Sequence, residues 1–217
     1  MPRETEIKLR LHNAKSFLAA LKKLGAKPVS TRVHEHNVIF DTPDSGLAKH
    51  GQLLRIRTET PVGNTKGKKP SPKASSRTIL TFKSPPRELA IGPAGAPSDR
   101  LHKVREEIEV VLTDAATLQK ILEGLGLKGW FRYEKYRTAY RLSRRFPWAK
   151  DLLVDLDETP IGTFVELEGP PDAIDHAASE LGYSSHDYIL KNYLVLYLDE
   201  CKRHGLQPTH MLFSGSK

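Results

Sequence analysis

The stretch Glu4-Thr5-Glu6-Ile7-Lys8-Leu9-Arg10-Leu11, near the start of the chain, decides the fold. Successive side chains of a β-strand point to opposite faces of a sheet, so residues two apart share a face. Read at that period, the aliphatic side chains fall on one face and the charged side chains on the other. The stretch is therefore either a strand with a solvated charged face or a strand that carries a binding site of carboxylates followed by cations.

Six later stretches repeat this alternation of charged and aliphatic positions. Their polar members are Arg55 and Arg57; Thr81 and Lys83; Arg105, Glu107 and Glu109; Lys135 and Arg137; Asp155 and Asp157; and Glu166 and Glu168. In one antiparallel sheet, a single face would bear about a dozen charges of both signs. The predicted helices need the aliphatic faces to pack against, which leaves the charged faces on the inside of a curled sheet. We therefore expect an α+β fold built on a closed β-barrel that is lined with charge.

Four helices are expected on the outside of this barrel, over residues 13–24, 114–125, 170–181 and 187–204. Asn13 and Asp114 are typical N-cap residues, and Gly25 and Gly126 are typical residues at a helix end. Two segments rich in Pro and Gly, 60–76 and 85–101, interrupt the strand pattern.

The strand pattern resumes on both sides of these two segments, so we interpret them as flexible loops within one domain. The domain is predicted to span residues 1–204, and residues 205–217 are predicted to form a disordered tail. The internal resemblance between residues 4–40 and 104–142, each strand-helix-strand, is suggestive only.

Composition restricts the class of protein. Of 217 residues, 38% are hydrophobic and 28% charged, which is typical of a soluble globular protein. No apolar run approaches membrane-spanning length, and Met1-Pro2-Arg3-Glu4 does not resemble a signal peptide. Cys201 is the only cysteine, so we expect no disulfide and no cysteine-based metal cluster. A cytoplasmic location follows as the expectation.

The formal charge of +8 indicates anionic partners. Nucleic acid is not favoured, because part of the surplus lies in the 60–76 loop and no basic strand is interleaved with aromatic residues that could stack on bases. Carboxylates and waters are the oxygen ligands that suit Mg²⁺ or Mn²⁺, and arginine and lysine suit the oxygens of a phosphate chain. A divalent metal bound to a triphosphate would match both sets of charge in the predicted barrel.

The residues Glu4-x-Glu6-x-Lys8 resemble the ExExK signature of the CYTH family, the triphosphate tunnel metalloenzymes, which include class IV adenylyl cyclases, thiamine triphosphatases and inorganic triphosphatases. Later motifs follow in order: Leu54-Arg55-Ile56-Arg57, Leu80-Thr81-Phe82-Lys83, Glu134-Lys135-Tyr136-Arg137, Leu156-Asp157-Glu158 and Phe164-Val165-Glu166-Leu167-Glu168. The resemblance covers roughly residues 1–200. It implies an eight-stranded antiparallel tunnel, with helices outside, that holds a triphosphate in its middle.

By this resemblance, three sets of side chains form the site. The metal, Mg²⁺ or Mn²⁺, would be held by Glu4, Glu6, Asp157, Glu166 and Glu168. The phosphates would be bound by Lys8, Arg55, Arg57, Lys83, Lys135 and Arg137, with Lys191 as an additional candidate that could equally be a solvated lysine. Further carboxylates of the tunnel would be Glu107 and Glu109. The catalytic members would be Glu4, Glu6, Lys8, Arg57, Lys83 and Arg137.

The expected function is metal-dependent action on a small-molecule triphosphate, with no nucleic-acid or membrane partner. We favour hydrolysis of inorganic triphosphate or of an organic triphosphate (a nucleotide or thiamine triphosphate). The alternative is a class IV adenylyl cyclase that converts ATP to cyclic AMP and pyrophosphate. Cyclisation needs a nucleoside pocket, for which His34, His36 and Asn37 are candidates, although surface residues are the preferred interpretation. A non-catalytic binder of polyphosphate or nucleotide is a second alternative, and both monomer and homodimer stay open.

Overall fold

The computed structural model describes residues 3–62, 75–86 and 102–215. Most of the two loops predicted at 60–76 and 85–101 lies outside these ranges. Within these ranges the chain forms nine strands: β1 Arg3–Leu11, β2 Lys27–Pro28, β3 Val33–Asp41, β4 Leu53–Pro61, β5 Arg77–Lys83, β6 Lys103–Leu112, β7 Lys128–Arg141, β8 Leu153–Thr159 and β9 Gly162–Glu168.

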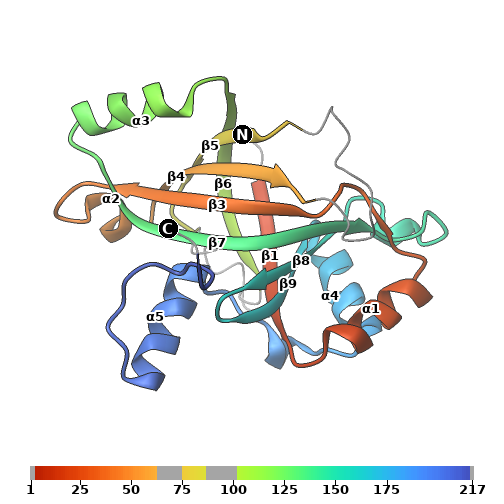
Figure 1. The fold of residues 1–217 in the computed structure, drawn as a ribbon. Helices are drawn as coiled ribbons and strands as arrows, with labels where there is room; N and C mark the ends of the chain where they lie inside the picture. Colours follow the sequence, from red (N-terminus) through yellow and green to blue (C-terminus); the bar gives the residue numbers. More distant parts are fainter. Residues whose placement is uncertain (1–2, 63–74, 87–101, 216–217) are drawn as a thin grey trace, which may run out of the picture.

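Eight of these strands form a closed antiparallel barrel (Figure 1). Their order is β7-β3-β4-β5-β6-β1-β9-β8, and the pairing of β8 with β7 closes the ring. The short β2 lies outside the ring and pairs with the end of β7. The predicted fold class is therefore confirmed. The strand that follows α1 in the sequence is divided in two, because β2 ends at Pro28 and β3 begins at Val33.

The helices pack on the outside of the barrel: α1 Ala14–Lys23, α2 Gly46–Lys49, α3 Ala115–Gly124, α4 Pro171–Glu180 and α5 Tyr193–His204. As predicted, Asn13 and Asp114 cap α1 and α3, accepting hydrogen bonds from the backbone N–H of Ser16 (3.1 Å) and Thr117 (2.9 Å). None of the described helices has the length and apolar character needed to cross a membrane.

The aliphatic faces of the strands meet these helices, as their alternation requires. The largest apolar core joins β1, β8 and β9 to α1 and α4, with Ile7, Leu21, Val154, Leu167 and Ile174 among its most buried members. A smaller core, of Phe40, Ile56 and Leu122, lies beneath α3. Ile108 and Val110 on the outer face of β6 are about half exposed, but most of the aliphatic outer faces are covered by helices. The charged faces of the strands point into the barrel.

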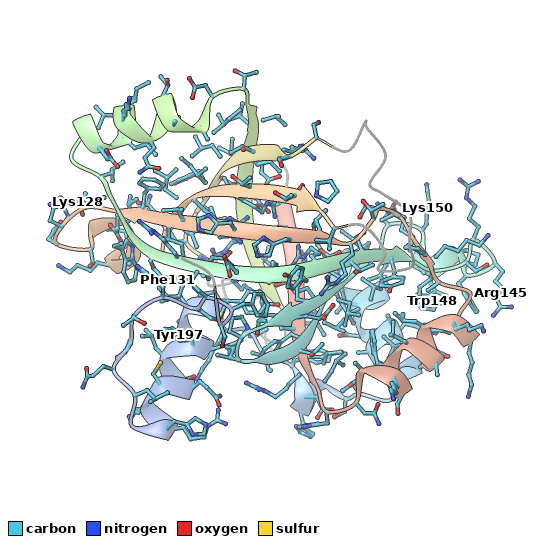
Figure 2. All side chains as sticks on the ribbon, viewed as in Figure 1. Lys128, Phe131, Arg145, Trp148, Lys150 and Tyr197 are labelled. Carbon is cyan, nitrogen blue, oxygen red and sulfur yellow. The ribbon has the colours of Figure 1, made fainter. Side chains whose placement is uncertain are left out.

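One end of the barrel interior is apolar. Ile39, Phe131, Tyr133 and Phe164 project from the strands and pack against α5. Figure 2 shows Phe131 beside Tyr197 of α5, and the centroids of these two rings are 5.7 Å apart. Helix α5 therefore packs against this end, and it carries Tyr193 to the interior.

Helix α5 begins at Tyr193, later than the predicted residue 187. The preceding segment is held extended, because Ile189 and Lys8 exchange two backbone hydrogen bonds of 2.8 and 3.0 Å. A chain that donates and accepts in this way adds to the edge of β1 and cannot continue as a helix at the same residue.

The segment after Gly205 is ordered along the barrel, in contrast to the predicted disordered tail. Met211 is only 1% exposed, and its backbone exchanges hydrogen bonds with Arg132 and Glu134 of β7. The backbone N–H of Phe213 donates to a carboxylate oxygen of Glu134 (3.1 Å). Met211, an apolar residue in a polar stretch, is therefore positioned by its contacts with a strand that is distant in the sequence.

Candidate active site

The barrel encloses a cavity of about 460 Å³, a volume typical of small-molecule sites. Residues from all eight barrel strands and from the start of α5 line it. The carboxylates among the described lining residues are Glu4, Glu6, Glu35, Glu59, Glu107, Glu109, Asp155, Glu166 and Glu168. The cations are Lys8, Arg55, Arg57, Arg77, Lys83, Lys103, Arg105, Lys135 and Arg137. These nine negative and nine positive formal charges cancel, so the surplus of +8 lies elsewhere on the chain.

Most of the site residues predicted from the sequence come together at this cavity. Those that line it are Glu4, Glu6, Lys8, Arg55, Arg57, Lys83, Glu107, Glu109, Lys135, Arg137, Glu166 and Glu168. Asp157 lies in the wall, with no exposed surface, behind the lining residues. Lys191 does not line the cavity; its side chain is 57% exposed and pairs with Asp199 at 2.7 Å. The geometry favours the solvated-lysine interpretation of Lys191.

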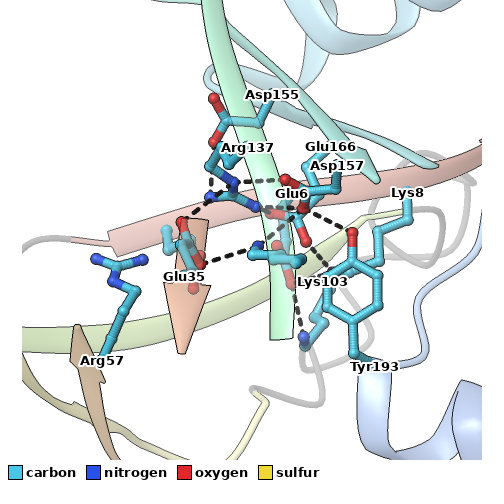
Figure 3. Close-up of polar contacts among 12 residues, drawn as sticks. Glu6, Lys8, Glu35, Arg57, Lys103, Arg137, Asp155, Asp157, Glu166 and Tyr193 are labelled. Carbon is cyan, nitrogen blue, oxygen red and sulfur yellow. Dashed lines mark hydrogen bonds and ion pairs between the residues drawn. The ribbon is translucent and has the colours of Figure 1, made fainter. Parts of the chain in front are cut away.

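Arg137 of β7 is the centre of the ion-pair network (Figure 3). Its guanidinium donates to both oxygens of Asp157 (2.7 and 2.6 Å), contacts Asp155 at 2.8 Å and donates to Glu166. Burial lowers the pKa of Arg137, but these carboxylates outweigh burial and raise it well above its usual value. Burial acts in the opposite direction on the carboxyl of Glu166 and raises its pKa. Arg137 and the nearby lysines outweigh burial and hold this pKa well below its usual value. Arg137 and Glu166 are therefore both charged.

Lys8 of β1 joins a second pair of carboxylates. Its ammonium lies 3.1 Å from Glu6 and 3.3 Å from Glu166, and Lys103 contacts Glu6 at 2.6 Å. Burial and the like charge of Lys8 together lower the pKa of Lys103 to about 8, against the attraction of Glu6. Two cations thus share one carboxylate, which leaves positive charge on this wall available to an anion.

The remaining predicted cations are also paired across strands. Lys83 of β5 contacts Glu4 at 2.7 Å and Glu107 at 3.2 Å, and Arg57 of β4 contacts Glu109 at 3.1 Å. A bound phosphate chain must therefore displace carboxylates from these cations.

Carboxylates that crowd together indicate where a divalent cation fits. Burial, together with the neighbouring Glu4, Asp155 and Glu166, raises the pKa of Glu168 to about 7. Burial also raises the pKa of Asp155 to about 6, against the attraction of Arg137. Within the described ranges, Glu168 forms no ion pair. A hard cation would relieve this repulsion, so the donor set fits Mg²⁺ or Mn²⁺.

The described residues hold no preformed group of three or more carboxylate, imidazole or thiol ligands. Four of the five carboxylates predicted to bind metal are instead paired with lysine or arginine, and Glu168 is the exception. Asp155, which the sequence analysis did not assign, lines the cavity, whereas Asp157 is enclosed. These carboxylates therefore suit a divalent metal in their chemistry. On metal binding, they would have to exchange their lysine and arginine partners for the metal.

Sequence reasoning missed several residues of the cavity. Glu35 and Lys103 face the interior, and the alternation of their strands could have identified both. Asp155 was placed on the charged inner face but was given no role in the site. Tyr193 could not have been identified in this way, because α5 reaches the site only through tertiary packing. Its hydroxyl donates to Asp157 at 2.7 Å.

The three residues considered for a base pocket do not lie together. Asn37 is inside the barrel wall with no exposed surface. His34 packs on the outside, 4.9 Å from Tyr136 and 6.5 Å from Phe213 between ring centroids. Adjacent strand residues point to opposite faces, so His34 and His36 share a face that Asn37 does not.

Comparisons with known proteins agree with this fold. The family model described as CYTH domain matches residues 2–193. A Methanocaldococcus jannaschii protein, provisionally named adenylate cyclase, is 28% identical over 166 residues, 76% of this chain and 75% of that protein.

Two solved structures have the same fold. One from Vibrio parahaemolyticus, also provisionally named adenylate cyclase, has a TM-score of 0.64 at 18% identity over 89% of this chain and 96% of that one. A Hippeastrum protein, provisionally named adenylyl cyclase and described as having a dominant triphosphatase activity, has a TM-score of 0.54 at 21% identity over 94% and 97% of the two chains. Since the family model covers nearly the whole sequence, the chain belongs to the CYTH family.

Proposed function

We propose that the protein is a metal-dependent triphosphatase that hydrolyses inorganic triphosphate or an organic triphosphate. The observation that carries the proposal is the cavity of a closed barrel that nine carboxylates and nine cations line together. A triphosphate alone would add excess negative charge to this balanced lining. A triphosphate with divalent metal supplies both kinds of partner, phosphate oxygens for the cations and a metal for the carboxylates.

The roles follow from the contacts. Glu4, Glu6, Glu166 and Glu168, with Asp155 beside them, are the carboxylates that would hold the metal. When bound, a divalent metal neutralises the phosphate chain and acidifies a water for attack. Lys8, Arg57, Lys83, Lys135 and Arg137 would then bind the phosphate oxygens and stabilise the charge that develops on them.

Asp157 has a different role from the one the family resemblance implies. It accepts hydrogen bonds from Lys135, Arg137 and Tyr193 and has no exposed surface. A carboxylate so enclosed orients the two cations toward the cavity, so we assign it to positioning.

Hydrolysis is favoured over cyclisation by the lining of the cavity. Its aromatic residues within the described ranges are Tyr133 and Tyr193, and both hydroxyls are engaged, with Arg55 (2.9 Å) and Asp157 (2.7 Å). His34 and His36 lie on the outer face, so they supply no base pocket there. The Hippeastrum protein, described as having a dominant triphosphatase activity despite its cyclase name, shows that such a name does not exclude hydrolysis.

A cyclase remains the second candidate, because the relative from M. jannaschii carries that provisional name. Cyclisation would use the same phosphate-binding cations, with the ribose 3′-hydroxyl of ATP as nucleophile and pyrophosphate as leaving group. The two activities differ in their products.

The test is product analysis with tripolyphosphate and with ATP, each with Mg²⁺ and with Mn²⁺, following orthophosphate, pyrophosphate and cyclic AMP. Glu6→Gln should lose activity by about 10²–10³-fold, as expected when a charge-stabilising group of a site is removed. Glu123→Gln is the matched control, because Glu123 lies exposed on α3, away from the cavity.

Orthophosphate without cyclic AMP supports the triphosphatase, and cyclic AMP with equal pyrophosphate supports the cyclase. Tight binding of tripolyphosphate with no product under any condition would contradict both and indicate a binding protein.

A further inference from the structure

Glu35 of β3 is an unusual carboxylate, because it is fully buried and forms no hydrogen bond. Its exposed surface is 0%, and both of its oxygens lack a hydrogen-bond partner among the described residues. A buried charged group without hydrogen bonds is costly to folding unless other charges compensate it. The compensation must therefore come from cations at longer range.

Those cations belong to the phosphate-binding set. Lys135 lies 3.6 Å and Arg137 3.7 Å from the Glu35 carboxylate (Figure 3). Burial raises the pKa of Glu35, but Lys135, Arg137, Arg57 and Arg55 outweigh burial and lower it to about 2. Glu35 is thus an anion at neutral pH, placed next to the cations that face the cavity.

Glu35 differs from the other carboxylates around Arg137 in what it can reach. Asp155 and Glu166 line the cavity beside further carboxylates, where a metal could take them from Arg137. Glu35 lines the same cavity, but the charges that act most strongly on it are all cations. The carboxylate paired with it across the strands, Glu59, is itself bound to Arg57 at 3.1 Å. Glu35 therefore has no unpaired carboxylate beside it with which to share a metal, and it stays with the cations.

We propose that Glu35 is a fixed counter-ion and positioning residue, which competes with phosphate for Lys135 and Arg137 and so limits how tightly the cavity holds its substrate and product. The inference rests on the proposed function, because it assumes a phosphate ligand. A competing anion in the wall weakens binding of the ground state and allows the product to leave.

The test is the affinity of the whole protein for tripolyphosphate and for pyrophosphate, measured by calorimetry in wild type and in Glu35→Gln. The substitution keeps the shape and removes the charge. Both ligands should bind about tenfold tighter, the order expected when one nearby like charge is removed at intermediate dielectric. In turnover, both KM and kcat should fall. KM falls because the substrate binds more tightly, and kcat falls because pyrophosphate is released more slowly. A purely structural role for Glu35 predicts the opposite sign, weaker binding.

Two controls separate charge from packing. Glu35→Asp keeps the charge and should bind within about twofold of wild type. Glu123→Gln makes the same charge change at an exposed position of α3, away from the cavity, and should also bind within about twofold of wild type.

Glu35→Met supplies a second neutral variant, since an apolar side chain of similar size often replaces a buried charge without loss of stability. Equal or weaker binding in the folded neutral variants overturns the proposal, and so does failure of both to fold, because Glu35 would then be a structural ion. Failure of wild type to bind tripolyphosphate would instead contradict the proposed function itself.

Discussion

The hydroxyl of Tyr193 donates a 2.7 Å hydrogen bond to Asp157, and this contact joins α5 to the ion-pair network inside the barrel. Asp157 is also held by Lys135 (2.8 Å) and Arg137 (2.6 Å). Burial raises the pKa of Tyr193 well above its usual value, and the nearby Asp157 and Glu166 raise it further. The hydroxyl therefore keeps its proton at neutral pH and donates it to Asp157.

Removing this hydroxyl tests the link. Tyr193→Phe should lower the free energy of unfolding by about 1.5–3 kcal/mol, the range for a hydrogen bond to a charged group. Activity should fall as well, because Asp157 loses one of its three donors. Denaturant unfolding and steady-state kinetics measure the two effects. Tyr183→Phe, at a partly buried ring with no described partner for its hydroxyl, should change neither; an equal effect in both variants would refute the link.

Arg137→Lys tests whether the shape of the guanidinium matters as well as its charge. Lysine keeps the positive charge but cannot contact Asp155, Asp157 and Glu166 together, as the planar guanidinium does. Triphosphate hydrolysis should fall by about 10²-fold. The exposed Arg141→Lys is the control and should keep full activity. Retention of activity in Arg137→Lys would show that a point charge suffices.

Stability should depend on pH through Glu168. Its folded pKa of about 7 lies above the usual value near 4.5, so the folded state holds a proton that the unfolded state has lost. The stability of the metal-free protein should therefore fall as pH rises from about 4.5 to 7, by about 1–3 kcal/mol. Asp155, whose pKa is raised to about 6, contributes in the same direction below pH 6. Thermal unfolding of wild type and Glu168→Gln across this range therefore measures the contribution of Glu168 as the difference between the two profiles.

Two further points separate the contribution of Glu168 to stability from the contributions of other groups. The carboxylates whose pKa is lowered, such as Glu6 and Glu166, lose their contribution only below the usual carboxylate range, so they act in a different pH window. Mg²⁺ should raise the melting temperature more at pH 8 than at pH 5, because Glu168 is then ionised. A Glu168→Gln profile identical to that of wild type would show that Glu168 is not the group that titrates.

The ordered tail predicts a cost for Met211→Ala. Met211 is 1% exposed and packs into the core beneath α5, so truncation should destabilise the protein by about 2–5 kcal/mol. Leu206, in the same tail, is 62% exposed, and Leu206→Ala should stay within about 0.5 kcal/mol of wild type. Equal stability of the two variants would indicate that the tail does not pack on β7 in solution.

The strand sequences by themselves determined the barrel and most of its lining. Which face a side chain occupies depends only on its position along a strand, so Glu4, Glu6 and Lys8 could be placed together before any pairing was known. The same reasoning assigned Arg55 with Arg57 and Glu166 with Glu168. Helix caps such as Asn13 are equally local, since the cap and its donor are three residues apart.

Only the tertiary structure decided how these charges pair. The contacts of Arg137 with Asp155, Asp157 and Glu166 depend on the register of β7, β8 and β9, which no single strand specifies. Packing at the apolar end of the barrel likewise brings Tyr193 to Asp157 and Met211 to β7. The position of Glu35 on the inner face could be read from its strand. Its burial among four cations required the closed barrel. The reason is that the partners of an ion depend on distance in space and not on distance along the chain.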